Sequence, residues 1–212
     1  MIPPTTGHDH PTSVTPAQPM RAIYERRAVR TYAPAAVSEH AIRALLDAAV
    51  HAPTAVHEEP WRFVVVQDRA VLKRISDQAK SLAVVNAARH GNLLKPPGAS
   101  GDGIRSILAD PAFNIFYDAN TLVVICARLI NDFVVADCWL AAENLMLAAT
   151  ADGLGTCVVG FAVEALNTPA TKAVLGIPAD MTAVAPIIVG VPRGDAPRVP
   201  RKAAVVLRWL RV

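Results

Sequence analysis

The sequence predicts a single domain of mixed helices and strands, and three observations support this. A chain of 212 residues is long enough for one well-buried domain and short for two. Runs rich in Val and Ile, at 61–67 and 121–127, have the composition of buried strands. The segments between such runs carry apolar residues at helical spacing. Strands that alternate with helices, taken alone, argue for a parallel, doubly wound sheet.

The first half of the chain is expected to hold three helices and one strand. A short helix begins near Pro19, and a second begins at Ser38, whose hydroxyl is a good N-cap. Pro53 ends the second helix because its ring cannot continue one. The strand over 61–67 follows, and a third helix starts at about Arg69.

The second half contains the longest predicted helix, over 132–152, which has no Gly or Pro and is apolar on most sides. A helix that is apolar all round is buried, and in so small a domain this points to a partner subunit. The other elements expected here are strands over 121–127, 156–161 and 181–191, a short helix opened by Thr168-Pro169 and stopped by Gly176, and a last apolar segment over 203–210.

The N-terminal residues 1–18 are rich in Pro, Thr and His and lack apolar periodicity, so we expect a mobile tail before a single domain over 19–212. His8 and His10 are interpreted as solvated, and no metal site is predicted. The segment 95–103 is a loop by composition. No window approaches the ~20 uninterrupted apolar residues of a membrane span, and the start lacks a cationic beginning followed by an apolar core. We therefore expect a cytoplasmic protein without a membrane partner.

Composition limits the possible partners. Just over half of the residues are apolar (52%) and only 18% are charged, which favours oligomerisation. The net charge of +3 is modest and basic residues are not interleaved with aromatic ones, so nucleic acid is not expected to bind. Basic residues gather instead in two short clusters that suit a small anion: Arg26, Arg27 and Arg30, and Arg193, Arg198, Arg201 and Lys202.

The usual signatures of nucleotide or metal binding are missing. Gly153, Gly155 and Gly160 have the wrong spacing for GxGxxG and follow a helix, so the first two are better explained as a helix stop. The three cysteines are odd in number, form no CxxC pair and lie in apolar runs. We expect Cys126, Cys138 and Cys157 to be buried packing residues.

Four segments in order resemble the nitroreductase family. Residues 26–30 (RRAVR) are similar to an RRSxR-like motif, and 52–61 (APTAVHEEPW) to APSxxNxQPW. Residues 137–160 are similar to the family's long central helix and the turn after it, and Arg201-Lys202 to its last basic pair. The resemblance covers nearly everything from about residue 20, and only 87–112 diverge too far to be placed.

The resemblance implies an α+β fold with a mixed, mainly antiparallel central sheet flanked by helices, which overrides the parallel sheet expected above. It also implies an intertwined homodimer with FMN at each interface. The implied reaction is ping-pong: NADH or NADPH gives hydride to flavin N5, and a small electron acceptor such as a nitroaromatic or a quinone then takes the electrons. No catalytic side chain is needed, because the cofactor carries the chemistry.

The resemblance also implies the residues of the cofactor site. A phosphate is best satisfied by guanidinium groups, and the implied phosphate and ribityl contacts are Arg26, Arg27, Arg30, Arg201 and Lys202. Those expected along the ribityl chain and flavin ring are Pro53, Thr54, Ala55, His57 and Glu59, and backbone N–H groups of Val159 and Gly160 are expected near N5.

Three departures from the family pattern leave alternatives open. His57 stands where the family has Asn, Glu59 where it has Gln, and Ala28 lacks the hydroxyl of the family's Ser. Asn114 is a candidate for replacing one lost contact. Two other functions therefore remain: a flavin-storing or regulatory FMN-binding protein without turnover, and a flavin enzyme of the same fold that does not use nicotinamide.

Overall fold

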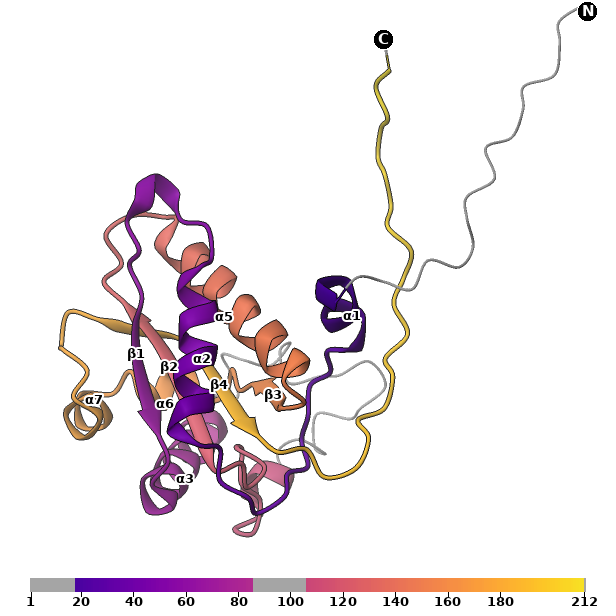
Figure 1. The fold of residues 1–212 in the computed structure, drawn as a ribbon. Coiled ribbons are helices and arrows are strands. Elements are labelled where there is room, and N and C mark those ends of the chain that lie inside the picture. The colour runs from indigo at the N-terminus through magenta and orange to yellow at the C-terminus, as the bar shows by residue number, and fades with distance from the viewer. Residues whose placement is uncertain (1–17, 86–105, 212) are drawn as a thin grey trace, which may run out of the picture.

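The computed structural model describes residues 18–85 and 106–211 (Figure 1). The predicted tail up to residue 17 and the predicted loop over 95–103 lie outside the described residues. Four strands form one sheet in the order β1-β2-β4-β3: β1 Arg62–Val66, β2 Thr121–Ala127, β3 Gly155–Val158 and β4 Thr182–Gly190.

Every pair of neighbouring strands in this sheet is antiparallel, so the parallel sheet first inferred from the alternation of elements is wrong. The alternation shows only that helices separate the strands. It does not determine at which end of the sheet the next strand starts, and therefore not whether neighbouring strands are parallel or antiparallel. One isolated parallel bridge, between Ala28 and Thr156, makes the arrangement mixed. The α+β fold with a mainly antiparallel sheet is confirmed.

The helices are α1 Gln18–Glu25, α2 Glu39–Val50, α3 Arg69–Val85, α5 Val134–Ala151, α6 Ala162–Leu166 and α7 Pro169–Leu175. The predicted caps are confirmed: the Ser38 hydroxyl accepts from the Ala41 N–H at 3.2 Å, and Gly176 ends α7 in a left-handed conformation. The strand expected over 156–161 is wrong beyond Val158. The chain turns at residues 159–161 and enters α6, a short helix that packs on α3 and carries too few residues to show periodicity.

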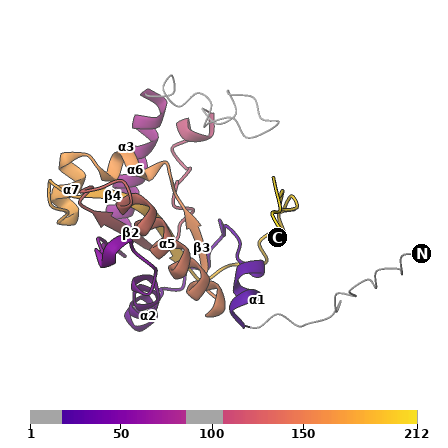
Figure 2. The same cartoon turned by 90° about the horizontal axis from the view of Figure 1, so that it is seen from above.

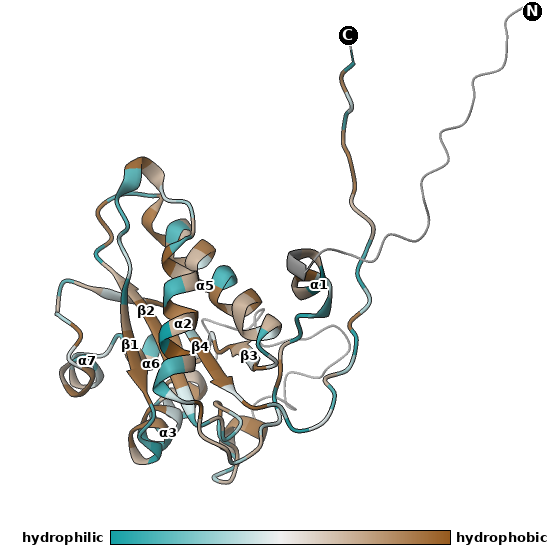
Figure 3. Cartoon of the chain, in the orientation of Figure 1, coloured by the Kyte–Doolittle hydropathy of each residue, from teal (hydrophilic) through white to brown (hydrophobic). Residues whose placement is uncertain are grey.

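The sheet lies between two helical layers (Figure 2). Helices α2 and α5 cover one face, and α3 and α6 cover the other. Side chains of β2 alternate between the two cores: Leu122 and Val124 face α3, and Val123 and Ile125 face α5. Because both faces are buried, β2 is apolar along nearly its whole length, and Figure 3 colours most of it as hydrophobic, whereas the helices around the sheet carry both hydrophilic and hydrophobic residues.

Helix α5 leaves part of its surface exposed in the single chain, and its burial on every side by a partner subunit stays a prediction. Its inner face packs on α2 and the sheet, but Val135, Trp139 and Leu140 in its first half are exposed. Among the described residues it is the one helix long and apolar enough, by length and composition, to cross a membrane. The core helix of a globular domain passes the same test, and α5 carries Asp137 and Glu143 and occupies that core position.

The chain beyond β4 forms an extended arm. One bridge joins Pro192 to Tyr32, and the residues after it have no regular secondary structure (Figure 1). The apolar segment predicted near the C-terminus lies on this arm and is highly exposed, with Leu207 97% and Trp209 70% accessible. Such an apolar arm lacks a covering surface in the single chain.

Candidate functional site

The basic segment after α1 crosses one edge of the sheet. The Val29 N–H donates to the Thr156 carbonyl at 2.9 Å, and the Arg193 N–H donates to Thr31 at 3.0 Å. These bonds hold the segment against β3 and the chain that follows β4. Arg30, predicted to bind phosphate, therefore projects from a segment fixed on both sides.

Two facing glycines make room for this segment. Gly155 and Gly190 are register partners in β3 and β4. A Cβ on Gly155 would lie 2.8 Å from Val29 Cγ2, and one on Gly190 would lie 2.6 Å from Tyr32 Cδ1. Val29 and Tyr32 thus occupy a notch that only glycines leave open, and Arg30 lies between them in sequence. Gly155, interpreted from the sequence as part of a helix stop, serves close packing, whereas Gly153 with φ +72° provides the stop.

The three predicted arginines of this segment have different surroundings. Arg26 Nε lies 3.6 Å from Glu143 Oε1 on α5. Arg27 donates to the Tyr24 carbonyl at 2.6 Å and to the Arg26 carbonyl at 2.8 Å, so its guanidinium caps the end of α1. Arg30 is exposed, and its guanidinium carbon lies 5.8 Å from the centre of the Tyr117 ring.

Buried groups beside this segment respond to its charge. Burial raises the pKa of the Cys157 thiol, while the charges of Arg30 and Arg26 act to lower it. Burial also raises the pKa of the Tyr32 phenol far above its ordinary value, and Arg30 again opposes the shift. The Tyr32 hydroxyl donates to the Val29 carbonyl at 2.7 Å. Both guanidinium groups therefore create a positive field at the start of β3.

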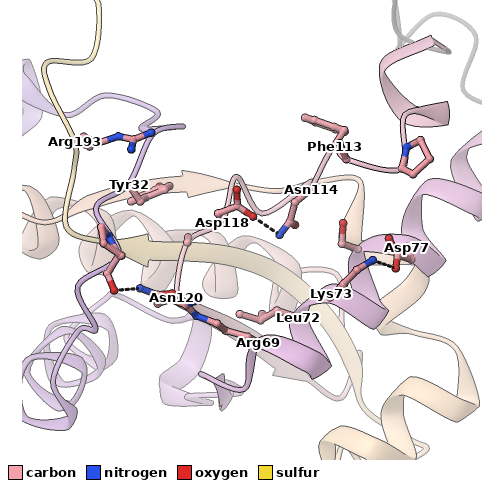
Figure 4. Close-up of a pocket in the computed structure, with 15 residues that line it drawn as sticks. Tyr32, Arg69, Leu72, Lys73, Asp77, Phe113, Asn114, Asp118, Asn120 and Arg193 are labelled. Atoms are coloured by element: carbon pink, nitrogen blue, oxygen red, sulfur yellow. Dashed lines mark hydrogen bonds and ion pairs between the residues drawn. The ribbon is translucent and has the colours of Figure 1, made fainter.

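A cavity of about 490 Å³ adjoins this segment and lies between α3 and the residues before β2 (Figure 4). Tyr32 and Arg193 line it on one side, and Lys73 and Asp77 of α3 on the other. Asn114 also lines it, but both ends of its amide are engaged: Nδ2 donates to Asp118 and Oδ1 accepts from the Phe116 N–H. That Asn114 replaces a lost cofactor contact thus stays a prediction. The hydrogen bonds that its amide already makes do not favour it.

The loop 53–59 carries five of the predicted residues and has unusual backbone geometry. It contains the 3₁₀ turn η1 Ala55–His57, and Val56, His57 and Glu59 have φ of +48°, +58° and +43°. Left-handed geometry is strained for a β-branched residue such as Val and concentrates at functional sites. The Ala55 N–H donates to both carboxylate oxygens of Asp137 at 3.3 and 3.4 Å, and Asp137 is only 4% exposed. A buried carboxylate on α5 therefore anchors this loop.

The structure does not bring all predicted residues together. The Ala55 loop meets the first turn of α5, whereas the segment of Ala28 meets β3 beyond the other end of that helix (Figure 1). A helix of 18 residues spans roughly 27 Å at 1.5 Å per residue. Within one chain, the loop that carries Pro53, Thr54, Ala55, His57 and Glu59 therefore lies far from the bridge between Ala28 and Thr156 beside Arg30, whereas Arg26 pairs with Glu143 near the middle of α5.

The remaining predicted residues lie in two places. Val159 and Gly160 follow β3, and the Val159 N–H already donates to the Pro186 carbonyl at 3.0 Å. Gly160 is exposed, and its N–H has no hydrogen-bond partner among the residues that the structure describes. Arg201 and Lys202 are exposed on the C-terminal arm, beyond the bridge at Pro192.

The cysteine prediction is confirmed: Cys126, Cys138 and Cys157 are free and buried. Burial raises the pKa of Cys126 to about 11 and that of Cys138 to about 12. Within 18–85 and 106–211, no group of three or more His, Cys, Asp or Glu side chains could hold a metal ion.

Comparison with known proteins decides the family. The profile of the Nitroreductase family matches residues 23–191. The chain belongs to the nitroreductase family. A relative in Archaeoglobus fulgidus, which carries the name NADH dehydrogenase/NAD(P)H nitroreductase, is 31% identical over 176 residues, covering 83% of this chain and 86% of its own. A nitrobenzene nitroreductase of Ectopseudomonas oleovorans is 28% identical over 197 residues, covering 79% and 84%.

Solved structures share the nitroreductase fold. A nitroreductase with bound FMN from Bacteroides fragilis superposes with a TM-score of 0.73 at 22% identity, covering 92% of this chain and 99% of its own. A second, from Desulfitobacterium hafniense and also with bound FMN, gives 0.74 at 18% identity, covering 91% and 100%. The fold expected from the resemblance is thereby confirmed.

Sequence reasoning missed two residues of this nitroreductase-family site. Asp137 was available as a signal, because it is an acidic residue on the apolar inner face of a helix. Tyr117 gave no local signal, because its contact with Arg30 joins residues 87 positions apart.

Proposed function

We propose that this nitroreductase-family chain binds FMN and transfers hydride from NADH or NADPH to a small electron acceptor such as a nitroaromatic or a quinone. The observation that carries the proposal is the basic segment held in the paired-glycine notch beside β3, with Arg26 and Arg30 around it. FMN, when bound, supplies the redox chemistry, because N5 accepts hydride from the nicotinamide and returns electrons to the acceptor in ping-pong order.

The residues present fit an FMN phosphate. That group carries close to two negative charges, and bidentate guanidinium donors satisfy it best. Arg30 has all of its N–H groups uncommitted among the described residues, and Arg26 makes only a 3.6 Å ion pair. We assign Arg26 and Arg30 to the phosphate and ribityl chain, with Arg201 and Lys202 of the arm as further contacts. Arg27 can contact the phosphate only if its hydrogen bonds to the carbonyls at the end of α1 break.

The flavin ring needs donors of a different kind. The uncommitted N–H of Gly160 is suited to donate toward N5, whereas the amide of Val159 is occupied by Pro186. An open environment at Gly160, with nothing within 4 Å of an added Cβ, leaves space for a ring. We therefore assign the backbone donor to Gly160 and limit Val159 to packing against the ring.

We further propose that the site is completed by a second copy of the chain. The loop that carries Pro53, Thr54, Ala55, His57 and Glu59 is anchored to Asp137 but is distant from Arg30 in the same chain. A two-fold related copy would present this loop to the first copy's basic segment. The exposed apolar face of α5 and the apolar arm supply surface for such a homodimer. The bound FMN of the two neighbouring structures supports the same cofactor here.

The absorption and reduction of the purified protein test the proposal. We expect a yellow protein that releases FMN, and not FAD, on denaturation, and whose flavin is bleached by NADH or NADPH under anaerobic conditions. A colourless protein that takes up no added FMN would refute the cofactor assignment. Bound FMN that nicotinamide leaves oxidised would favour a nicotinamide-independent flavin enzyme.

Three free thiols without a disulfide are consistent with the cytoplasm, which we propose as the compartment.

A further inference from the structure

We infer that Tyr117 is a positioning residue that sets the guanidinium of Arg30 toward the cofactor without neutralising it. The inference rests on the proposed function, because the readout is FMN binding. The Arg30 guanidinium lies over the face of the Tyr117 ring, with 5.8 Å between the guanidinium carbon and the ring centre. A cation within about 6 Å of an aromatic face is attracted to it.

The kind of contact matters for what Arg30 can bind. An ion pair would place a carboxylate on the N–H edge of the guanidinium and cancel its charge. An aromatic face attracts the cation without placing a carboxylate on its N–H groups, so its charge and its five donors stay available. Among the described residues, the Arg30 side chain makes no hydrogen bond or ion pair, and the Tyr117 ring lies close to its guanidinium. A group held in this way keeps its charge and its donors for an anionic ligand.

The turn that carries Tyr117 is strained and internally closed. Tyr117 and Asp118 are consecutive residues with φ of +52° and +57°. The Tyr117 N–H donates to the Asn114 carbonyl at 2.9 Å, and Asn114 Nδ2 donates to Asp118 Oδ1 at 3.0 Å. Two left-handed non-glycine residues in succession persist only when their surroundings hold them. The turn thus fixes the backbone from which the tyrosine ring projects.

Helix α3 holds this turn from below. Lys80 is 7% exposed, and its ammonium donates to the Phe113 carbonyl at 2.7 Å and the Asp110 carbonyl at 3.2 Å. The buried Ser76 hydroxyl accepts from the Ile115 N–H at 3.1 Å. A buried ammonium is tolerated only when partners satisfy it. These bonds hold the backbone on both sides of Asn114, whose carbonyl accepts from the Tyr117 N–H.

A second aromatic ring fixes the orientation of the tyrosine. The Phe113 ring meets the Tyr117 ring edge to face, with centres 5.8 Å apart and planes at 80°. On the other side of the contact, the notch at Gly155 and Gly190 holds the backbone on either side of Arg30. Both partners therefore approach each other from rigid supports, as positioning of a charged side chain requires.

A double-mutant cycle on FMN affinity tests the inference. The proteins are wild type, Tyr117→Leu, Arg30→Ala and the double variant, with Tyr117→Phe as the matched control that keeps the ring. We expect Tyr117→Leu to weaken FMN binding about 3- to 10-fold and Tyr117→Phe to change it less than twofold. In the Arg30→Ala background, Tyr117→Leu should not reduce FMN affinity further, because the guanidinium through which the ring acts is absent. Leu and Phe share the Cβ of Tyr, so the positive φ costs all three similarly.

Two results overturn the inference. One is an undiminished loss from Tyr117→Leu in the Arg30→Ala background, which would mean that the ring supports the fold and not the guanidinium. The other is a Tyr117→Leu protein that binds FMN as wild type does. If wild type takes up no FMN at all, the proposed function fails, and the positioning role with it. Urea unfolding of the same four proteins would then still show whether Tyr117 and Arg30 interact: coupled losses would leave the contact standing, and additive losses would exclude it.

Discussion

Single residues of this chain bear on function mainly through the donors they leave free. The Arg27 guanidinium donates to carbonyls at the end of α1, whereas the Arg30 guanidinium donates to none of the described residues. His57 and Glu59 depart from the family's amides, and both lie exposed on a strained loop, open to a ligand or a second copy. Neighbours in one motif thus have unequal roles that residue type alone does not separate.

Removing the side chain of Arg26 or Arg30 should weaken FMN binding and spare the fold. Arg26→Ala and Arg30→Ala should each reduce FMN affinity by about 1.5–3 kcal/mol, the usual worth of a hydrogen bond to a charged group. Fluorescence titration with FMN measures the loss, and urea unfolding checks the fold. Arg43→Ala is the control, because Arg43 forms only an exposed pair with Glu39 on α2. Unchanged affinity in both variants would mean that the phosphate site is misplaced.

Asp137 should be required for the geometry of the loop 53–59. Asp137→Ala removes the acceptor of the Ala55 N–H and is expected to cost about 1–2 kcal/mol of stability, since the bonds of 3.3 and 3.4 Å are long. Asp137→Asn keeps an acceptor oxygen and should cost less.

Urea unfolding and the rate of proteolysis within residues 54–59 check this. Thr150→Val on the same helix is the control, because the Thr150 hydroxyl bonds only within α5, to Met146. Equal behaviour of the Ala and Asn variants would argue against the anchoring role.

At the scale of elements, the position of the basic segment depends on β3 and β4. A segment without regular secondary structure is held by hydrogen bonds to Thr156, Val191 and the Arg193 N–H and by packing over two glycines. Helix α3 in turn supports the residues before β2 that face this segment. The site is therefore a meeting of loops, and the rigid elements beneath them set its geometry.

Filling the notch should disturb both stability and cofactor binding. Gly190→Ala places a Cβ 2.6 Å from Tyr32, and such overpacking costs about 1–3 kcal/mol. Because Tyr32 is two residues from Arg30, FMN affinity should fall as well. Thermal unfolding and FMN titration measure the two effects. The double variant Gly190→Ala/Tyr32→Leu removes the colliding ring and should lose less than the sum of the single variants. A fully additive loss would mean that Tyr32 does not meet the new methyl group.

At the scale of the whole molecule, the single chain is incomplete in two ways. The loop 53–59 and the segment that carries Arg30, both predicted to contribute to one cofactor site, lie toward opposite ends of α5, and the C-terminal arm exposes an apolar surface to solvent. We propose that a second copy of the chain accounts for both features, because it would supply the loop and cover the arm.

Removing the arm should therefore weaken the dimer. We expect the full chain to behave as a dimer in light scattering at micromolar concentration, with an interface well above ~2,000 Å². A chain ending at Lys202 lacks the exposed Leu207 and Trp209 and should dissociate at higher concentration. Arg208→Ala, which replaces an exposed charged residue of the arm and keeps its apolar residues, is the control. A full chain that is monomeric with FMN bound would contradict the shared site.

Local sequence signals predicted most of the elements, because helix and strand periods and caps depend on neighbouring residues. The Ser38 cap, the strand at 121–127 and the stop at Gly176 follow from such signals. The FMN-site residues came from resemblance to a family, since no local pattern joins residue 30 to residue 201. Strand direction, the α6 turn, the notch and the Tyr117 contact were decided by tertiary packing. Each depends on which distant segment fills a given space, and a periodic pattern states only which face of an element is buried.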